Sequence, residues 1–145
     1  PPLRAERDRD ALREGLADGT IDALCSDHAP VDEDAKQLPF SEAEAGATGL
    51  ELLLPLALKW GAEMKLPLAK TLAVVSEHPA RIMGVPGGHL AAGEAADLCV
   101  FDPAASVRIS AEGLKSQGKN TPFMGQALPG KVRYTVVSGL VVYEG

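Results

Sequence analysis

Residues 21–31 read IDALCSDHAPV, a short apolar run followed by the six residues SDHAPV. The run over residues 21–25 is typical of a β-strand, and it ends just before the ionisable pair Asp27 and His28. In barrel enzymes, catalytic groups lie where a buried strand ends and a loop opens. The segment therefore predicts an α/β protein with a candidate catalytic position at Asp27.

The flanking sequence extends this pattern of alternating helix and strand. Residues 7–17 place apolar side chains at helical spacing, and Gly19 is suited to end that helix because glycine tolerates a left-handed cap. Residues 27–48 lack clean periodicity and predict a long loop, in which the acidic run 32–34 is solvated. Further helices are expected over residues 50–64, 67–76 and 78–84.

After Gly84 the sequence changes to short strands. They are expected over residues 97–101, 107–109, 132–137 and 140–143. Ser138 and Gly139, between the last two runs, predict a two-residue hairpin turn. We therefore divide the chain into an α/β part, residues 1–84, and a β part, residues 85–145.

The composition limits the class of protein. Of the 145 residues, 46% are hydrophobic, which supports a folded core. A net charge of −6 and a pI near 5.0 argue against nucleic acid or an anionic membrane as the main partner. Cys25 and Cys99 lie in apolar runs and predict buried thiols in a reducing compartment. Without a signal-peptide or membrane-span pattern, we expect a cytoplasmic protein.

Asp27 has a functional and a structural interpretation. A carboxylate at the end of a strand can bind a metal ion or accept a proton from metal-bound water. Aspartate also begins turns and caps helices. Neighbouring residues of a strand face opposite sides, so a hydrogen-bonded His28 that orients the site is favoured over a metal-binding one. His78 is expected to cap or pack, and His89 to lie on the surface.

The sequence contains no complete zinc-binding pattern. His-x-His, His-Glu-x-x-His and Cys-x-x-Cys are all missing, and a zinc site needs several convergent ligands. A nucleophile elbow and a phosphate-binding glycine loop are missing as well. Asp27 could therefore contribute to a metal site only together with residues beyond this sequence.

Several spaced motifs occur in one order along the chain. They are PPLR at 1–4, DGTID at 18–22, SDHAP at 26–30, GLE at 49–51, HPARIMG at 78–84, GEAADL at 93–98 and KNTPFMG at 119–125. Together they resemble the dihydroorotase family of the amidohydrolase superfamily. The resemblance implies the C-terminal portion of a (β/α)8 TIM-type barrel plus part of a small β-sandwich. It also implies that this chain is a fragment, since a whole barrel takes roughly 250 residues.

In an active member of this family, Asp27 would be a metal ligand and the catalytic base, and zinc would polarise the substrate amide. The reaction interconverts N-carbamoyl-L-aspartate and dihydroorotate in pyrimidine biosynthesis. Zinc is expected if the full-length protein is active. For this chain alone we expect neither a cofactor nor activity.

Two departures from the family pattern concern the substrate loop. The family's DHAPH reads DHAPV here, so Val31 replaces a histidine that helps to hold the substrate carboxylate. The loop at residues 43–46, usually AxxG with proline before its glycine, reads AEAG, and Glu44 places an acid near an anionic substrate. The resemblance thus assigns a degenerate substrate loop to Arg4, Val31, Ala43 and Gly46.

These departures favour a non-catalytic dihydroorotase-like subunit that supports aspartate carbamoyltransferase. An active zinc dihydroorotase is the alternative, and a hydantoinase-like cyclic amidohydrolase is disfavoured by the KNTPFMG and PPLR motifs. The expected partners are the remainder of the barrel, aspartate carbamoyltransferase and further copies in a homo-oligomer. We expect neither nucleic acid nor a membrane as a partner.

Overall fold

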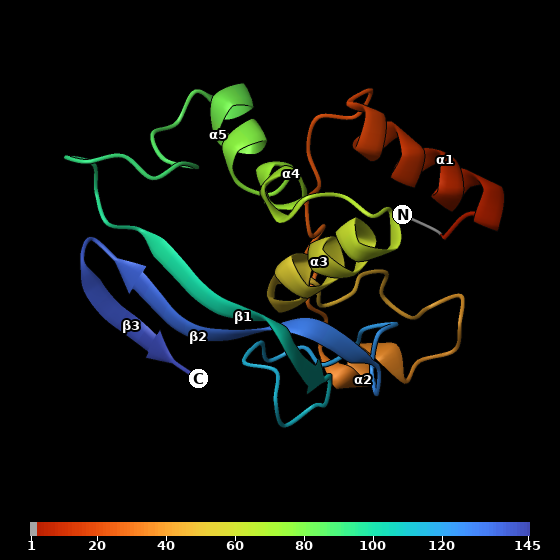
Figure 1. Ribbon diagram of the computed structural model, residues 1–145. Coiled ribbons are helices and arrows are strands. Elements are labelled where there is room, and N and C mark those ends of the chain that lie inside the picture. The colour runs from red at the N-terminus through yellow and green to blue at the C-terminus, as the bar shows by residue number, and fades with distance from the viewer. Residues whose placement is uncertain (1–2) are drawn as a thin grey trace.

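The computed structural model describes residues 3–145 and shows a group of helices beside a three-stranded sheet (Figure 1). The elements follow in the order α1 (Glu6–Asp18), α2 (Glu33–Lys36), η1 (Leu50–Leu52), α3 (Leu53–Glu63), α4 (Leu68–Ala73), α5 (Glu77–Met83), β1 (Leu98–Arg108), β2 (Ala127–Val137) and β3 (Leu140–Glu144). Helices precede strands, as the sequence predicts, and the α/β class is confirmed. Pro1 and Pro2 lie outside the described residues.

The predicted helices are present, with small differences at their ends. α1 ends at Gly19, whose φ of 89° is left-handed. The predicted helix over residues 50–64 is a 3₁₀ turn, η1, that continues into α3, and Pro55 lies in the first turn of α3, where its missing N–H costs nothing. The loop over residues 27–48 contains one unpredicted element, α2, whose acidic first turn suits a helix N-terminus.

The predicted strand over residues 21–25 is wrong. The segment has no strand partner among the described residues. Instead, the N–H of Leu24 donates to the carbonyl of Val74 at 2.9 Å. An apolar run supplies side chains for a strand but not the neighbouring backbone that a sheet requires.

The expectation of buried thiols is also wrong. Cys25 and Cys99 are both exposed. Each lies in an extended segment, and the described residues leave one side of both segments uncovered. Apolar neighbours in the sequence therefore do not suffice to bury a cysteine; a packed layer must cover it.

β1 joins two segments that the sequence predicts as separate strands, 97–101 and 107–109. The pairing of β1 with β2 shifts register just after Asp102. At this irregularity the Asp102 carboxylate accepts the N–H of Ala104 at 3.0 Å and of Ala105 at 3.2 Å. The bulged backbone is thus satisfied, and the strand continues through it.

The sheet is antiparallel, in the order β1-β2-β3. Its second hairpin turns at Ser138 and Gly139, as predicted. Their φ angles of 50° and 82° are both left-handed, as a type I′ turn requires.

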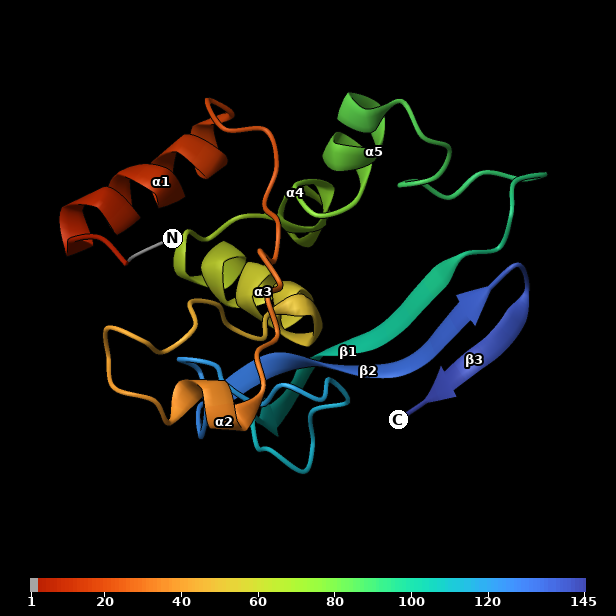
Figure 2. The same ribbon diagram turned by 180° about the vertical axis from the view of Figure 1, so that it is seen from behind.

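The hydrophobic core has two parts, and α3 contributes to both. On one side, Leu52 of η1 and Leu56 of α3 pack with Ile109, Leu114 and Leu128, and both views show α3 lying over β2 (Figures 1 and 2). On the other side, Trp60 packs with Leu16 and Val74. α3 therefore connects the β part of the chain to α1 and α4.

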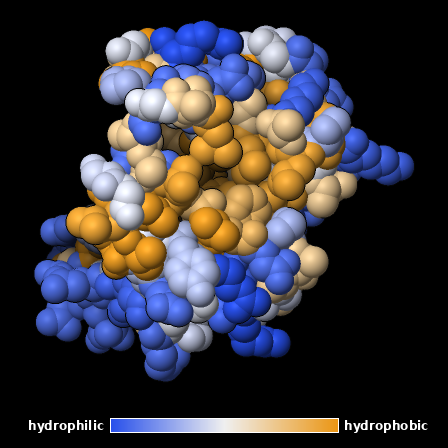
Figure 3. Space-filling view, turned by 60° about the vertical axis from the view of Figure 1, so that its left-hand side comes forward, coloured by the Kyte–Doolittle hydropathy of each residue, from blue (hydrophilic) through white to orange (hydrophobic). Residues whose placement is uncertain are grey.

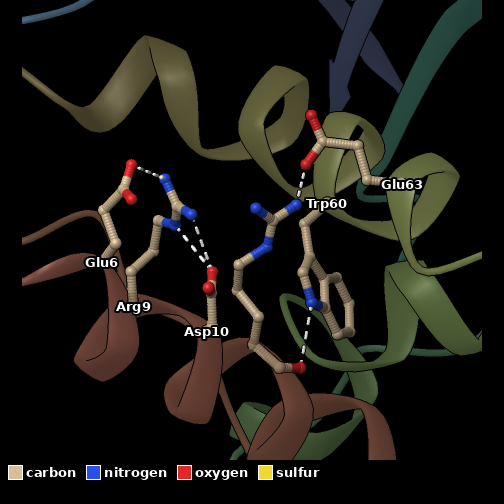
Figure 4. Close-up of polar contacts among 6 residues, drawn as sticks. Glu6, Arg9, Asp10, Trp60 and Glu63 are labelled. Carbon is tan, nitrogen blue, oxygen red and sulfur yellow. Dashed lines mark hydrogen bonds and ion pairs between the residues drawn. The ribbon is translucent and has the colours of Figure 1, made fainter.

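Trp60 also fixes α1 through polar contacts. Its indole N–H donates to the carbonyl of Arg13 at 3.2 Å, and the Arg13 guanidinium pairs with Glu63 (Figure 4). A buried tryptophan places most of its ring in the core and needs a partner for its N–H. This contact ties one face of α1 to α3.

The surface carries an apolar region around a hollow (Figure 3). Exposed apolar side chains occur along β3, where Leu140 is 71% exposed and Val142 61%. Patches of this kind usually mark contact surfaces.

In the described residues, no helix has the length and apolarity needed to span a membrane.

Gly61 tests the packing of α3 on α4. A methyl group at this position would overlap the Thr71 side chain, which is 2% exposed. We expect Gly61→Ala to destabilise the full-length protein by about 1–3 kcal/mol, because overpacking outweighs the gain of roughly 0.5–1 kcal/mol in helix propensity. Thermal unfolding measures the effect. Gly113→Ala is the control, since its nearest neighbour lies 3.4 Å away; an equal loss in both variants would contradict the packing.

Candidate active site

Asp27 adopts a conformation that aspartate tolerates but does not favour. Its φ is 45°, in the left-handed region. Asp is enriched there among non-glycine residues, yet such conformations cost about 1–3 kcal/mol and cluster at functional sites. Among the described residues, the Asp27 carboxylate accepts no hydrogen bond that would mark it as a turn or helix cap. The carboxylate is exposed and free to meet a ligand.

A cleft of about 140 Å³ lies beside Asp27. Three segments that are distant in the sequence form its walls. They are the Asp27 segment (Leu24, Cys25, Ser26, Asp27), the start of η1 and α3 (Ala47, Thr48, Gly49, Leu53, Leu56) and the connection between β1 and β2 (Pro122, Phe123). The cleft is mostly apolar with a single carboxylate at its edge, and it is smaller than the roughly 300–1,000 Å³ of a typical small-molecule pocket.

His28 is held by backbone donors of the second segment. Its Nδ1 accepts the N–H of Gly49 and the N–H of Leu50, each at 3.1 Å. Since Nδ1 accepts both bonds, a metal ion could bind only at the opposite ring nitrogen. These two N–H groups begin η1, where a helix leaves its first donors unpaired, so the ring acts as the cap of that helix.

Residues 26–29 run alongside residues 47–50. The N–H of Ala29 donates to the carbonyl of Ala47 at 3.0 Å. A Cβ on Gly49 would lie 2.6 Å from the carbonyl oxygen of Ser26, so this close approach requires glycine. Asp27 therefore lies between two residues, Ser26 and His28, that both contact the same neighbouring segment.

Val31 lies where two glycines approach it. A Cβ on Gly46 would come within 3.0 Å of Val31 Cγ2 and 2.6 Å of the Ala29 carbonyl oxygen. A Cβ on Gly118 would lie 2.9 Å from the Val31 nitrogen and 3.0 Å from its oxygen. The structure therefore brings Val31 and Gly46 of the predicted substrate loop together, and it adds Gly118.

The other predicted loop residues lie further from this contact. Ala43 belongs to a turn in which its N–H donates to the Pro39 carbonyl at 2.9 Å. Lys36 holds the end of the loop by donating to the carbonyl oxygens of Glu44 and, at 2.8 Å, Gly46. Arg4 is exposed, and no hydrogen bond or ion pair joins it to the cleft among residues 3–145.

Glu51 attaches the connection between β1 and β2 to η1. Its carboxylate accepts the N–H of Lys115, at 2.8 and 2.9 Å, and the N–H of Ser116 at 2.8 Å. Partial burial by itself would raise the pKa of Glu51. The backbone N–H groups favour the charged form more strongly, so the pKa lies below its usual value.

The donor set allows this chain one role at a metal ion. No group of three His, Cys, Asp or Glu side chains gathers within residues 3–145. Asp27 is uncommitted and fits as a single oxygen ligand, whereas His28 has used one ring nitrogen. A zinc ion at Asp27 would therefore need its remaining ligands from outside these residues.

Two features of the candidate site could not be predicted from the sequence. Neither the place of Pro122 and Phe123 in the cleft, the approach of Gly118 to Val31 nor the link from Glu51 to Lys115 follows from periodicity. Residues 118–123 lie about 90 positions from the Asp27 segment, and Lys115 lies 64 positions from Glu51, so no local pattern encodes such contacts. The KNTPFMG and GLE motifs mark the segments but not their contact.

Comparison with known proteins identifies the class. The model described as the amidohydrolase family matches residues 2–142, so the chain belongs to the amidohydrolase family. Within it, the resemblance to dihydroorotases is confirmed. The chain is 47% identical over 145 residues to a dihydroorotase-like protein of Pseudomonas aeruginosa and 45% identical over 144 residues to a dihydroorotase of Geobacter sp. strain M21. The matches cover 100% and 99% of this chain but 34% of each relative.

Solved structures of related enzymes match the fold. A D-hydantoinase (dihydropyrimidinase) from Thermus sp. superposes with a TM-score of 0.90 at 29% identity. An L-hydantoinase (dihydropyrimidinase) from Arthrobacter aurescens gives a TM-score of 0.85 at 36% identity. Each match covers 99% of this chain and 33% of the solved chain. The chain thus spans about a third of the proteins that it resembles.

His28 provides a test of the contact between the Asp27 segment and η1. We expect His28→Ala to destabilise the full-length protein by about 1–3 kcal/mol, because it leaves two N–H groups without their acceptor. Hydrogen exchange at Gly49 and Leu50 should rise together with this loss. His28→Asn, which keeps an acceptor near Nδ1, should recover most of the protection. Exposed His89 is the control, and a similar effect of His89→Ala would contradict this role.

The pH dependence of stability tests the contact of the Glu51 carboxylate with the backbone of Lys115 and Ser116. Its folded-state pKa is lowered, so its contribution to stability is present above the unfolded-state value and is lost as pH falls through the folded-state value. We expect Glu51→Gln to lower the melting temperature at pH 7, and the difference from the parent protein to shrink below about pH 4.5, the ordinary value of the carboxyl group. Glu42→Gln, at an exposed carboxylate, is the control. A difference independent of pH would rule out the charged contact.

Proposed function

We propose that this chain is part of a dihydroorotase-like protein that has lost dihydroorotase activity and acts as a structural subunit for aspartate carbamoyltransferase. In this proposal, residues 1–84 form the last part of a (β/α)8 barrel and residues 85–145 form part of a β-sandwich. The rest of the full-length protein would cover the exposed apolar side chains, including those along β3. The free thiols Cys25 and Cys99 suit a cytoplasmic protein.

The observation that carries the proposal is the surroundings of Val31. The family resemblance places a substrate-binding histidine at this position, and valine offers no hydrogen bond. Val31 is half-buried and closely approached by Gly46 and Gly118. A carboxylate buried here without a partner would cost several kcal/mol. The exposed Glu44 carboxylate adds repulsion toward an anionic substrate.

The similarity to a dihydroorotase-like protein of Pseudomonas aeruginosa supports the proposal. In such a subunit the cleft would be a remnant, and the remaining task of the chain would be to present a folded surface. The chain would perform that task by associating with aspartate carbamoyltransferase and with further copies of the same subunit.

Asp27 favours the alternative, an active zinc dihydroorotase. Its strained backbone and uncommitted carboxylate at the edge of the cleft are features of a working site. In that case Asp27 would bind the metal and accept a proton from the attacking water, and zinc would supply the polarising charge. His28 would position Asp27 through its contacts with Gly49 and Leu50.

The experiment compares the full-length protein with its Asp27→Asn variant. We expect no interconversion of N-carbamoyl-L-aspartate and dihydroorotate by either protein, and zinc well below one equivalent by elemental analysis. Co-elution with aspartate carbamoyltransferase in size-exclusion chromatography should be the same for both. Stoichiometric zinc together with turnover that Asp27→Asn abolishes would reject the proposal and establish the alternative.

A further inference from the structure

Thr48 is a buried polar residue that the proposed function does not use. It is 1% exposed and lines the cleft beside Asp27. Buried side chains of this kind need hydrogen-bond partners, and the choice of partner shows what the residue holds in place. The hydrogen-bond partners of Thr48 come from the C-terminal half of the chain.

Both polar donors of Thr48 bind the connection between β1 and β2. Its N–H donates to the carbonyl of Asn120 at 2.7 Å, and its hydroxyl Oγ1 donates to the carbonyl of Gly118. In both views this connection, drawn in cyan, lies beside the orange segment around α2 (Figures 1 and 2). Thr48 therefore fixes a segment some 70 residues away in the sequence.

The residues on either side of Thr48 hold the Asp27 segment. Ala47 accepts the N–H of Ala29, and Gly49 donates to the His28 ring. Thr48 thus lies where three segments meet, residues 26–31, residues 46–50 and residues 116–120. We call this meeting point the Thr48 junction.

The third segment returns to the first through Gly118. Its Cα faces the backbone of Val31 so closely that a Cβ would lie 2.9 Å from the Val31 nitrogen and 2.9 Å from Pro30 Cβ. The position of Gly118 therefore decides how much space remains around Val31. That position in turn depends on the hydrogen bond from Thr48.

We propose that Thr48, which itself lines the Asp27 cleft, is a positioning residue that holds the connection between β1 and β2 against Val31, and with it Pro122 and Phe123, which form one wall of the cleft. Asp27 keeps its left-handed φ of 45° because its neighbours on both sides are fixed to residues 47–50. When the Thr48 hydroxyl is lost, residues 116–120 are free to move away from Val31, and the cleft wall at Pro122 and Phe123 loses its anchor. This role concerns the geometry of the cleft and does not depend on whether the cleft is catalytic.

The test separates the hydroxyl of Thr48 from its bulk. Thr48→Val in the full-length protein keeps the volume, removes the donor and leaves the Gly118 carbonyl without its partner. We expect hydrogen exchange in residues 26–31 and 116–120 to become about tenfold faster, by the usual cost of an unsatisfied buried group. Thr48→Ser keeps the donor and should stay within about twofold of the parent protein.

Thr71 is the matched control. It is also buried, at 2% exposure, but its hydroxyl donates to Pro67, only four residues away. Thr71→Val should leave exchange in both junction segments unchanged. Equal acceleration by Thr71→Val and Thr48→Val, or failure of Thr48→Ser to restore protection, would overturn the proposal.

Gly118→Ala perturbs the Thr48 junction at residue 118 instead of residue 48. It is the substitute test if Thr48→Val does not fold. The added methyl group would push against Pro30 and Val31, so exchange should rise in residues 26–31 while α1 keeps its protection. Unchanged exchange in residues 26–31 would overturn the proposal. None of these measurements depends on enzymatic turnover. Detection of dihydroorotase activity would therefore reject the proposed function but would not affect the proposed role of Thr48.

Discussion

The hydrogen bonds from Gly49 and Leu50 to the His28 ring are the contact on which the candidate site depends. They complete the first turn of η1, and they fix the Asp27 segment to the same point. η1 continues into α3, which packs against the sheet on one side and against α1 and α4 on the other. The position of one imidazole ring therefore relates the cleft to both parts of the hydrophobic core.

Asp27 and Val31, four residues apart, differ in what they offer a ligand. Asp27 retains an exposed carboxylate and a strained backbone, both of which suit chemistry. Val31, four residues later, presents only apolar atoms and is closely approached by two glycines. The Val31 side chain thus offers a substrate no hydrogen bond, which is why we propose the structural role over the catalytic one.

Local signals in the sequence predicted most elements of the fold. The glycine cap of α1 and the Ser138-Gly139 turn each follow from the geometry of single residues. The errors occurred where structure depends on a neighbour. Residues 21–25 have the composition of a strand but no paired backbone, and both cysteines lack a covering layer. β1 continues through Asp102 because hydrogen bonds at the bulge compensate for the interruption.

The sequence by itself determined the family and the α/β class, and it predicted SDHAPV as the candidate site, because each rests on residue types in a fixed order. Only the tertiary structure decided what surrounds that motif. It placed Gly118 against Val31, Thr48 between three segments, and Glu51 on the backbone of Lys115 and Ser116. These contacts join residues some 65 to 90 positions apart, and their geometry depends on how α3 packs against the sheet, which no local pattern encodes.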